Sequence, residues 1–192
     1  MVDAVIAAAL PGLEPGAVLL DHTTTLPVLT AARSARLAAQ GVAYLHCPVF
    51  MGPAAARNAQ GSMMVAGPKA LFDRVQAALA AMTTRLEYMG ERTDLAAANK
   101  LFGNAMILSV SAAMADILTL AQASDVDAQD AAKLLGMLDL NAMVAGRGVN
   151  MAKGNFEPSF ELDMARKDVR LMLETAGARP LAQMAWKFAQ QA

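Results

Sequence analysis

The sequence predicts an α/β domain joined through one long helix to an all-α domain. Two observations support this fold class. Segments with the pattern of β-strands alternate with helical segments before Gly90, and no strand pattern of comparable strength follows it. The longest helical pattern begins just after this change, at Asp94, and continues to Ala123 without a proline. We therefore expect a first domain at residues 1–92 and a second at residues 93–192.

The first domain alternates strands with helices in the order expected of a largely parallel sheet. Strand patterns cover residues 17–21, 42–49, 62–66 and 85–88. Helical patterns cover residues 2–10, 28–40 and 69–82. Strands separated by helices favour parallel pairing over at least the first two strands. Because the Gly/Pro/Ala loop before residue 62 lacks a full crossover, the later pair could include an antiparallel member.

The second domain carries helical patterns only. They cover residues 94–123, 127–138, 163–176 and 181–191. Hydrophobic residues make up 56% of the chain, and its mean hydropathy is +0.35. We attribute this excess to helices that are buried on several faces, including against another subunit, so a homodimer is expected.

Composition argues against several kinds of partner. The longest apolar run, residues 105–115, is far shorter than the ~20 residues of a membrane span, and Asp116 ends it. A formal net charge of −1 without a basic run argues against nucleic acid. The single cysteine, Cys47, excludes an internal disulfide, and the absence of a secretory signal predicts a cytoplasmic protein. His22 and His46 share no ligand spacing with this cysteine, so no metal site is predicted.

The stretch NKLFGN, residues 99–104, places polar side chains inside an apolar helical pattern. Lys100 and Asn104 are four residues apart, so a helix projects them from one face toward the same ligand. A lysine in a partly desolvated site has a lowered pKa and can exchange a proton with a substrate oxygen or nitrogen near neutral pH. A lysine that reaches solvent from a helix end, beside a capping asparagine, is the alternative arrangement.

Two loops follow strands at the edge where open α/β sheets bind ligands. The first is residues 21–27 (DHTTTLP), and the second is residues 48–53 (PVFMGP). A threonine that caps the next helix would also explain the first loop, and a plain turn would explain the second. The GxG motif at residues 146–148 follows a helical region, so it lacks the strand that a dinucleotide fingerprint requires.

In this order and spacing, these stretches resemble the β-hydroxyacid dehydrogenases, the family that includes 3-hydroxyisobutyrate dehydrogenase. The 6-phosphogluconate dehydrogenases and imine reductases are more distant relatives. The family motif Asp-x-Ser-Thr-x-x-Pro is similar to residues 21–27, and its Lys-x-x-x-Asn matches Lys100 and Asn104. Its Lys-Asp pair in a late helix matches Lys167 and Asp168. The resemblance covers nearly the whole chain.

The resemblance implies hydride transfer between NAD or NADP and a small-molecule substrate, either a β-hydroxyacid or a related carbonyl or imine. Lys100 would then act as general acid in reduction and as general base in oxidation. Asn104 would orient the reacting oxygen or nitrogen. Thr24, Lys167 and Asp168 would bind the cofactor.

The substrate loop departs from the family pattern. The family commonly has Pro-Val-Ser-Gly-Gly there, and its serine and glycine backbone receive the substrate carboxylate. In this sequence Phe50 removes the hydroxyl, Met51 adds bulk and Gly52 still offers its backbone. We expect these three residues to bind the substrate, and the change favours a larger or less polar carbonyl or imine. Thr23 likewise stands where the family usually has serine.

The resemblance also implies that the first domain is the C-terminal half of a Rossmann-type domain. The Gly-rich pyrophosphate turn of the family has no counterpart in this sequence. We therefore expect either a fragment of a longer gene product or a natural remnant that cannot hold a dinucleotide unaided. The main alternative is a non-catalytic helical dimerisation or binding module, in which the polar motifs serve as caps.

Overall fold

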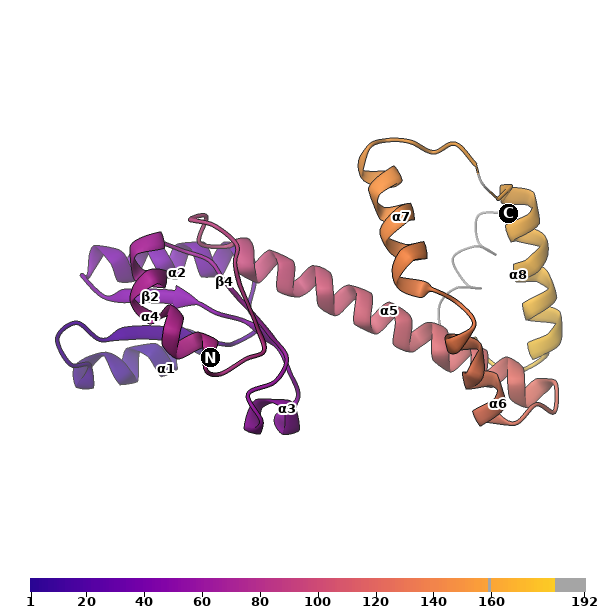
Figure 1. The fold of residues 1–192 in the computed structure, drawn as a ribbon, viewed down its shortest axis with the longest axis horizontal. Helices are drawn as coiled ribbons and strands as arrows, with labels where there is room; N and C mark the ends of the chain where they lie inside the picture. The colour runs from indigo at the N-terminus through magenta and orange to yellow at the C-terminus, as the bar shows by residue number, and fades with distance from the viewer. Residues whose placement is uncertain (159, 182–192) are drawn as a thin grey trace. The chain divides into compact units, whose positions relative to one another are not determined.

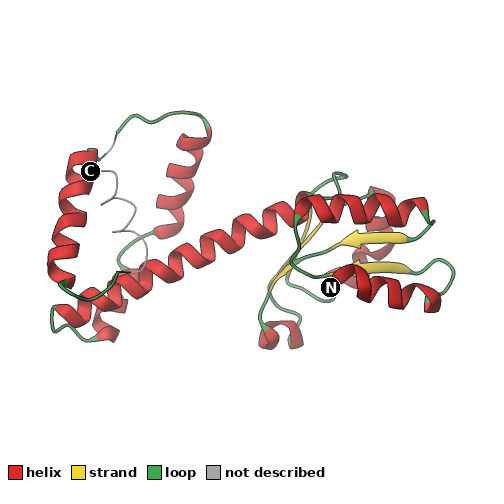
Figure 2. Cartoon of the chain, turned by 180° about the vertical axis from the view of Figure 1, so that it is seen from behind, coloured by secondary structure: helices red, strands yellow, loops and turns green. Residues whose placement is uncertain are grey.

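The computed structural model describes residues 1–158 and 160–181. The chain forms two compact units, Met1–Met106 and Ile107–Ala192 (Figure 1). Among the described residues, strands occur only in the first unit (Figure 2), which confirms the predicted α/β-then-all-α fold class. The two units divide within the long helix α5 (Leu95–Ala123), whereas the predicted domain boundary follows the composition change near Gly90.

The strands of the first unit form two small sheets that meet at one bridge. Strand β1 (Val18–Asp21) pairs in parallel with β2 (Ala43–His46), in the register Val18↔Ala43 to Asp21↔His46. Strand β3 (Val49–Phe50) is antiparallel to β4 (Ser62–Val65), and β4 is parallel to β5 (Arg85–Tyr88). An antiparallel bridge between His46 and Ala66 connects the sheets. The expected parallel first pair and antiparallel member are both present.

The segment 42–49 does not form the single strand that its pattern predicts. Its first part pairs with β1, and the chain then changes partner, so that Val49 pairs with Met63 of β4. Pro48 lies at the change, where its missing N–H cannot donate to a ladder, although its carbonyl accepts from the Met64 N–H at 3.0 Å. This change directs Phe50 toward helix α5.

Five helical segments complete the first unit before α5. They are α1 (Val2–Ala9), η1 (Leu10–Gly12), α2 (Pro27–Ala39), α3 (Pro53–Arg57) and α4 (Lys69–Ala80). Helices α2 and α3 begin at a proline, the residue favoured at the first helical position. The predicted helices at 2–10, 28–40 and 69–82 are confirmed within about two residues, the usual uncertainty of a helix end. Helix α3 occupies the predicted loop.

The core lies on both faces of the strands. Tyr44 and Leu45 are neighbours in β2 and therefore point to opposite faces. On the face covered by α4, the buried cluster is Leu45, Cys47, Met63, Val65, Phe72 and Leu79. On the face covered by α1 and α2, it is Ile6, Leu37 and Tyr44. A third cluster packs the start of α5 against β4: Met64, Ala66 and Ala96, with Phe50 partly buried beside them.

Helix α5 is a single helix of 29 residues. Its most apolar window has a hydropathy of 1.6, so by length and composition alone it could cross a membrane. The core helix of a soluble protein passes the same test. The apolar run at 105–115 is only part of this helix, so the length of that run does not exclude a membrane span. The absence of a membrane partner stays a prediction.

The second unit is helical throughout its described residues. Its elements after α5 are α6 (Ala128–Ala132), η2 (Lys133–Gly136), α7 (Leu140–Ala152) and α8 (Leu162–Ala176). The segment predicted as one helix at 127–138 is thus a short helix followed by a 3-10 turn. Helix α7 was not predicted, because Gly146 and Gly148 weaken its helical pattern. The helix expected at 181–191 lies outside the described residues, apart from its first position.

Candidate functional site

Lys100 lies on the first part of α5 with 9% of its surface exposed. Its ammonium Nζ lies 3.8 Å from the centre of the Phe50 ring. Among the described residues, no carboxylate forms an ion pair with it. Burial lowers the pKa of Lys100 below its usual value, because desolvation disfavours the charged form. This burial does not fit a lysine that reaches freely into solvent, and the role of Lys100 in proton exchange stays a prediction.

Phe50 reaches Lys100 because Gly103 leaves room for its ring. A Cβ placed on Gly103 would lie 2.2 Å from Cζ and 2.8 Å from Cε1 of Phe50, which is closer than real side chains approach. Gly103 follows Lys100 by three positions, so both face the same side of the helix. The ring therefore lies against the helix surface, under the ammonium.

The backbone of the loop at residues 48–53 packs closely against Gly61. This glycine has a φ of +99°, and a Cβ there would lie 2.7 Å from the Phe50 carbonyl oxygen and 2.8 Å from the Met51 Cβ. Such a conformation strongly favours glycine. Met51 is partly buried, and Gly52 is the exposed N-cap of α3. The structure thus brings Phe50 to Lys100, and Met51 and Gly52 follow on a tightly packed turn.

Asn104 lies one turn after Lys100 and is partly exposed. In the described part of the chain, its carboxamide makes no hydrogen bond, so both its donor and its acceptor can serve a ligand. Asn99 differs, because its Nδ2 donates to the Leu95 carbonyl oxygen at 2.9 Å. Of the two asparagines in NKLFGN, only Asn104 makes no side-chain hydrogen bond within the described residues.

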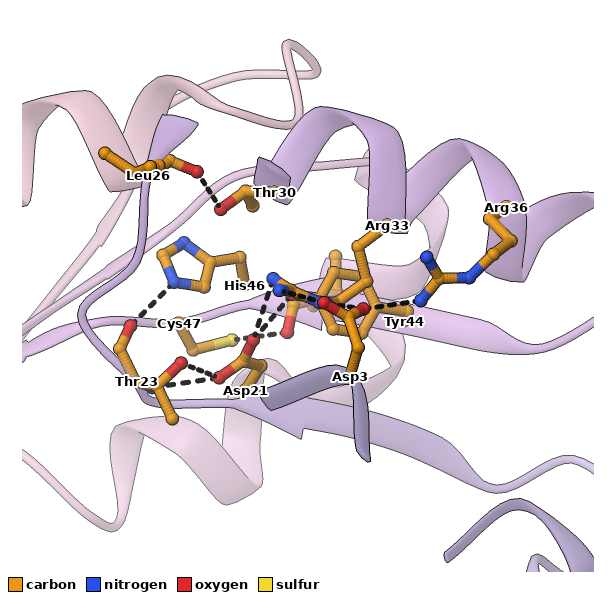
Figure 3. Close-up of polar contacts among 11 residues, drawn as sticks. Asp3, Asp21, Thr23, Leu26, Thr30, Arg33, Arg36, Tyr44, His46 and Cys47 are labelled. Atoms are coloured by element: carbon orange, nitrogen blue, oxygen red, sulfur yellow. Dashed lines mark hydrogen bonds and ion pairs between the residues drawn. The ribbon is translucent and has the colours of Figure 1, made fainter. Parts of the chain in front are cut away.

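The loop after β1 is ordered around Asp21 (Figure 3). The Thr23 hydroxyl donates to Asp21 Oδ1 at 2.6 Å, and the Thr23 N–H donates to the same oxygen at 2.9 Å. Helix α2 has Leu26 as its N-cap and no side-chain capping bond. The alternative of a capping threonine is therefore wrong. Thr24 is exposed, and no protein group in the described residues bonds its hydroxyl, so the hydroxyl is available to a ligand.

A buried polar network, which the sequence analysis missed, holds this loop in place. The Tyr44 hydroxyl donates to Asp21 Oδ2 at 2.7 Å, and His46 Nε2 donates to the Thr23 carbonyl oxygen at 2.8 Å (Figure 3). Burial alone would raise the pKa of Asp21, but hydrogen bonds from Thr23 and Tyr44 outweigh it and lower that pKa. Asp21 is therefore a carboxylate at neutral pH.

Arg33 completes the network and connects α1 to α2. It is only 2% exposed, and its Nε and Nη2 each donate to a carboxylate oxygen of Asp3 at 3.0 Å. Its Nη1 lies 3.7 Å from Asp21 Oδ2. One sequence feature could have indicated this role. The buried face of helix α2 consists of Thr30, Arg33, Ser34 and Leu37, so a charged residue lies among positions whose helical spacing is typical of a core face.

The histidines and the cysteine serve structural roles. His22 Nδ1 donates to the Cys47 carbonyl oxygen at 2.8 Å, and burial raises the pKa of the Cys47 thiol to about 12. Burial likewise lowers the pKa of His46, which keeps that ring neutral. No group of three potential metal ligands occurs among residues 1–158 and 160–181.

Lys167 and Asp168 lie in the second unit, on α8. Lys167 Nζ and Asp168 Oδ1 form an ion pair at 2.9 Å, and both side chains are about half exposed. The exposed, mutually paired groups are accessible to a ligand. Their assignment to the cofactor stays a prediction.

Two family models match the chain. Residues 1–90 match the NAD binding domain of 6-phosphogluconate dehydrogenase. Residues 95–192 match the model described as NAD-binding of NADP-dependent 3-hydroxyisobutyrate dehydrogenase. Together with the α/β fold, these matches define a chain of the NAD-binding dehydrogenase class. Because the second match alone covers more than half of the sequence, the chain belongs to the 3-hydroxyisobutyrate dehydrogenase-like family.

Curated relatives include enzymes that act on small oxygenated molecules. Glyoxylate/succinic semialdehyde reductase 1 of Arabidopsis thaliana is 31% identical over 85% of this chain and 56% of its own length. L-threonate dehydrogenase of Cupriavidus necator is 26% identical over 88% of this chain and 57% of its own length. The chain therefore spans a little over half the length of these relatives.

Solved imine reductases share the fold. The enzyme from Streptomyces aurantiacus superposes with a TM-score of 0.78 at 22% identity, over 90% of this chain and 63% of that one. The enzyme from Bacillus cereus gives a TM-score of 0.79 at 17% identity, over 98% of this chain and 69% of that one. At these identities the similarity establishes the fold alone.

Proposed function

We propose that this chain supplies the proton-handling site of an NAD- or NADP-dependent oxidoreductase that interconverts a hydroxyl or amine with the corresponding carbonyl or imine. One observation carries the proposal: Lys100 is buried, has no carboxylate partner among the described residues, and lies one turn from the free carboxamide of Asn104. A structural lysine would more often be ion-paired or solvated.

Lys100 would deliver the proton that balances hydride transfer. In reduction, Nζ donates a proton to the substrate oxygen or nitrogen, and in oxidation the neutral amine accepts one. Burial lowers the pKa of Lys100, which makes release of its proton easier than from a solvated lysine. General acid–base catalysis of this kind is worth roughly 10²- to 10⁴-fold. Asn104 would hold the reacting oxygen or nitrogen within reach of the ammonium.

The bound nicotinamide would supply the hydride. The exposed Thr24 hydroxyl fits a cofactor at this position, because it follows β1 at the carboxyl edge of the parallel pair. The buried network around Asp21 would keep that loop in shape before the cofactor arrives. The family resemblance makes Lys167 and Asp168 further candidates for polar contact with the cofactor.

The substrate class follows from the loop beneath Lys100. Phe50 and Met51 supply apolar surface where a hydroxyl would favour a carboxylate, so we assign a larger or less polar carbonyl or imine ahead of a small β-hydroxyacid. The name of one relative, glyoxylate/succinic semialdehyde reductase 1, supports the carbonyl class. Gly52 would contribute its exposed backbone.

The proposal is tested by titrating the purified chain with NADPH and NADH while following nicotinamide fluorescence. Oxidation of the bound cofactor is then measured with cyclic imines, aryl aldehydes and small semialdehydes. We expect saturable binding of one nicotinamide cofactor, and turnover that is fastest with the less polar substrates. Absence of binding by both cofactors would contradict a cofactor role for this chain.

A homodimer is part of the same proposal. The second unit exposes many large apolar side chains, among them Met137 at 80% and Phe156 at 74%. Apolar surface of this extent usually marks an interface. The same observation favours the second candidate, a non-catalytic dimerisation module. That module would dimerise without binding either nicotinamide cofactor.

A further inference from the structure

The ammonium of Lys100 is held by an aromatic ring. Nζ lies 3.8 Å from the centre of the Phe50 ring, well within the distance at which a cation is attracted to the π face. In the described residues, no carboxylate or hydrogen-bond acceptor takes this place. Phe50 is therefore the contact that determines where the charged end of Lys100 lies.

The ring is itself fixed by contacts that leave it little freedom. It fills the space above Gly103, where even a methyl group would collide with Cζ and Cε1. Its backbone is pressed against Gly61, whose positive φ permits the close approach to the Phe50 carbonyl oxygen. Met64 of β4 and Ala66, which directly follows that strand, pack beside it. A rigid ring in this position can hold a flexible lysine side chain.

We propose that Phe50 is the positioning residue for Lys100, and that Gly103 keeps the Phe50 ring in place beneath the ammonium. The catalytic meaning of this inference rests on the proposed function, but the contact itself can be tested without any turnover. Phe50 thus acts through Lys100, in addition to whatever surface it offers the substrate.

A ring suits a proton-exchanging lysine better than a carboxylate would. A carboxylate at this distance would favour the ammonium form strongly and oppose release of its proton. A ring attracts the cation more weakly and also excludes water. Phe50 can therefore fix the geometry of Lys100 while the amine still exchanges its proton.

The test is an NMR measurement on the full chain with ¹³C-labelled lysine. Protons above the face of an aromatic ring are shifted upfield, so the Lys100 side-chain methylene signal nearest Nζ is expected upfield of the other lysine signals. Its loss in Lys100→Met assigns it. We expect Phe50→Leu to return the signal to the ordinary lysine position, and Phe50→Tyr, which keeps a ring, to preserve the shift.

Gly103→Ala tests the second half of the inference. In the parent background it should displace the ring and abolish the upfield shift of Lys100. In the Phe50→Leu background it should change nothing further, because no ring remains to displace. Gly146→Ala is the matched control, since a Cβ at that helical glycine meets nothing within 4 Å. Circular dichroism verifies that each variant is folded.

An unshifted Lys100 signal in the parent protein would overturn the inference, as would a shift that survives Phe50→Leu. A shift that survives Gly103→Ala would overturn the role of Gly103. These outcomes are separate from the proposed function. If the shifts behave as expected but Lys100→Met keeps parental turnover, the positioning contact stands and the catalytic role of Lys100 fails.

Discussion

Arg33 is a charged side chain at a core position of helix α2. Its guanidinium is 2% exposed and is held by both carboxylate oxygens of Asp3, while Asp21 lies nearby at 3.7 Å. Such a group is stable only because it is paired, and removing one partner of a buried pair leaves an uncompensated charge. The network also shapes the loop that carries Thr24, so under the proposed function its loss would weaken cofactor binding as well as stability.

Arg33→Met keeps much of the side-chain volume but removes the charge. We expect the free energy of unfolding to fall by roughly 2 to 4 kcal/mol. This is less than the largest losses seen when a fully buried ion pair is broken, because the Asp3 side chain is 48% exposed and water screens the pair. Urea denaturation measures this change. Arg36→Met is the matched control: this arginine also contacts Asp3 but is half exposed, so its loss should cost less than about 1 kcal/mol. Equal effects of the two substitutions would contradict the account.

The pH dependence of stability follows from Asp3. Hydrogen bonds from Arg33 and Arg36 hold the pKa of Asp3 well below its unfolded value near 3.9. Because the folded pKa is the lower one, the stabilisation is complete above the unfolded pKa and is lost as pH falls below about 4. We expect Asp3→Asn to be less stable than the parent at pH 7, and the difference to shrink by pH 2.5. Denaturant titrations at both pH values measure it, and a constant difference would be evidence against the ion pair.

Part of the candidate site could be predicted from the sequence. The four-residue spacing of Lys100 and Asn104 is local information, and the helix preserves it. The contact of Lys100 with Phe50 joins residues on different elements, so no local pattern contains it. The same is true of Arg33 and Asp3, which lie 30 positions apart. Such contacts depend on how helices and strands pack together, and the periodicity of hydrophobic residues within one element does not predict that packing.

At the scale of elements, strands and helices were predicted where the local pattern and the packing agree. The segment 42–49 keeps one apolar pattern through Pro48, yet its two parts pair with different neighbours. Pairing partners are set by tertiary contacts, so the pattern predicted one strand where there are two. Helix α7 was missed for the opposite reason, since its two glycines weaken a helix that the structure nevertheless forms from an Asp139 cap.

The turn beneath the substrate loop provides an element-scale prediction. Gly61→Ala forces a side chain onto a φ of +99° and against Met51, so we expect a loss of about 1 to 3 kcal/mol in unfolding free energy. Gly12→Ala should be nearly neutral, because a Cβ there meets nothing within 4 Å and φ is not positive. Thermal and urea unfolding compare the two variants. If Gly61→Ala were as stable as Gly12→Ala, the positive φ of Gly61 and its close contact with Met51 would be contradicted.

At the scale of the whole molecule, the exposed apolar surface of the second unit predicts self-association. Sedimentation velocity of the chain should show a dimer whether or not NADPH is present. Met137→Lys combined with Met151→Lys should shift it toward monomer, because these side chains are 80% and 64% exposed and would place two charges in the interface. Val5→Lys, which changes a side chain 65% exposed in the first unit, is the control. A parent chain that sediments as a monomer at every concentration would refute the interface.

The central claim is that Lys100 handles the proton in hydride transfer. Its most direct test is the rate of NADPH oxidation by the chain with a cyclic imine, compared with the rate for Lys100→Met. We predict that the substitution lowers kcat by roughly 10²- to 10⁴-fold, the range for loss of a general acid, while the affinity for NADPH and the fold stay unchanged. Parental turnover in Lys100→Met would contradict the account.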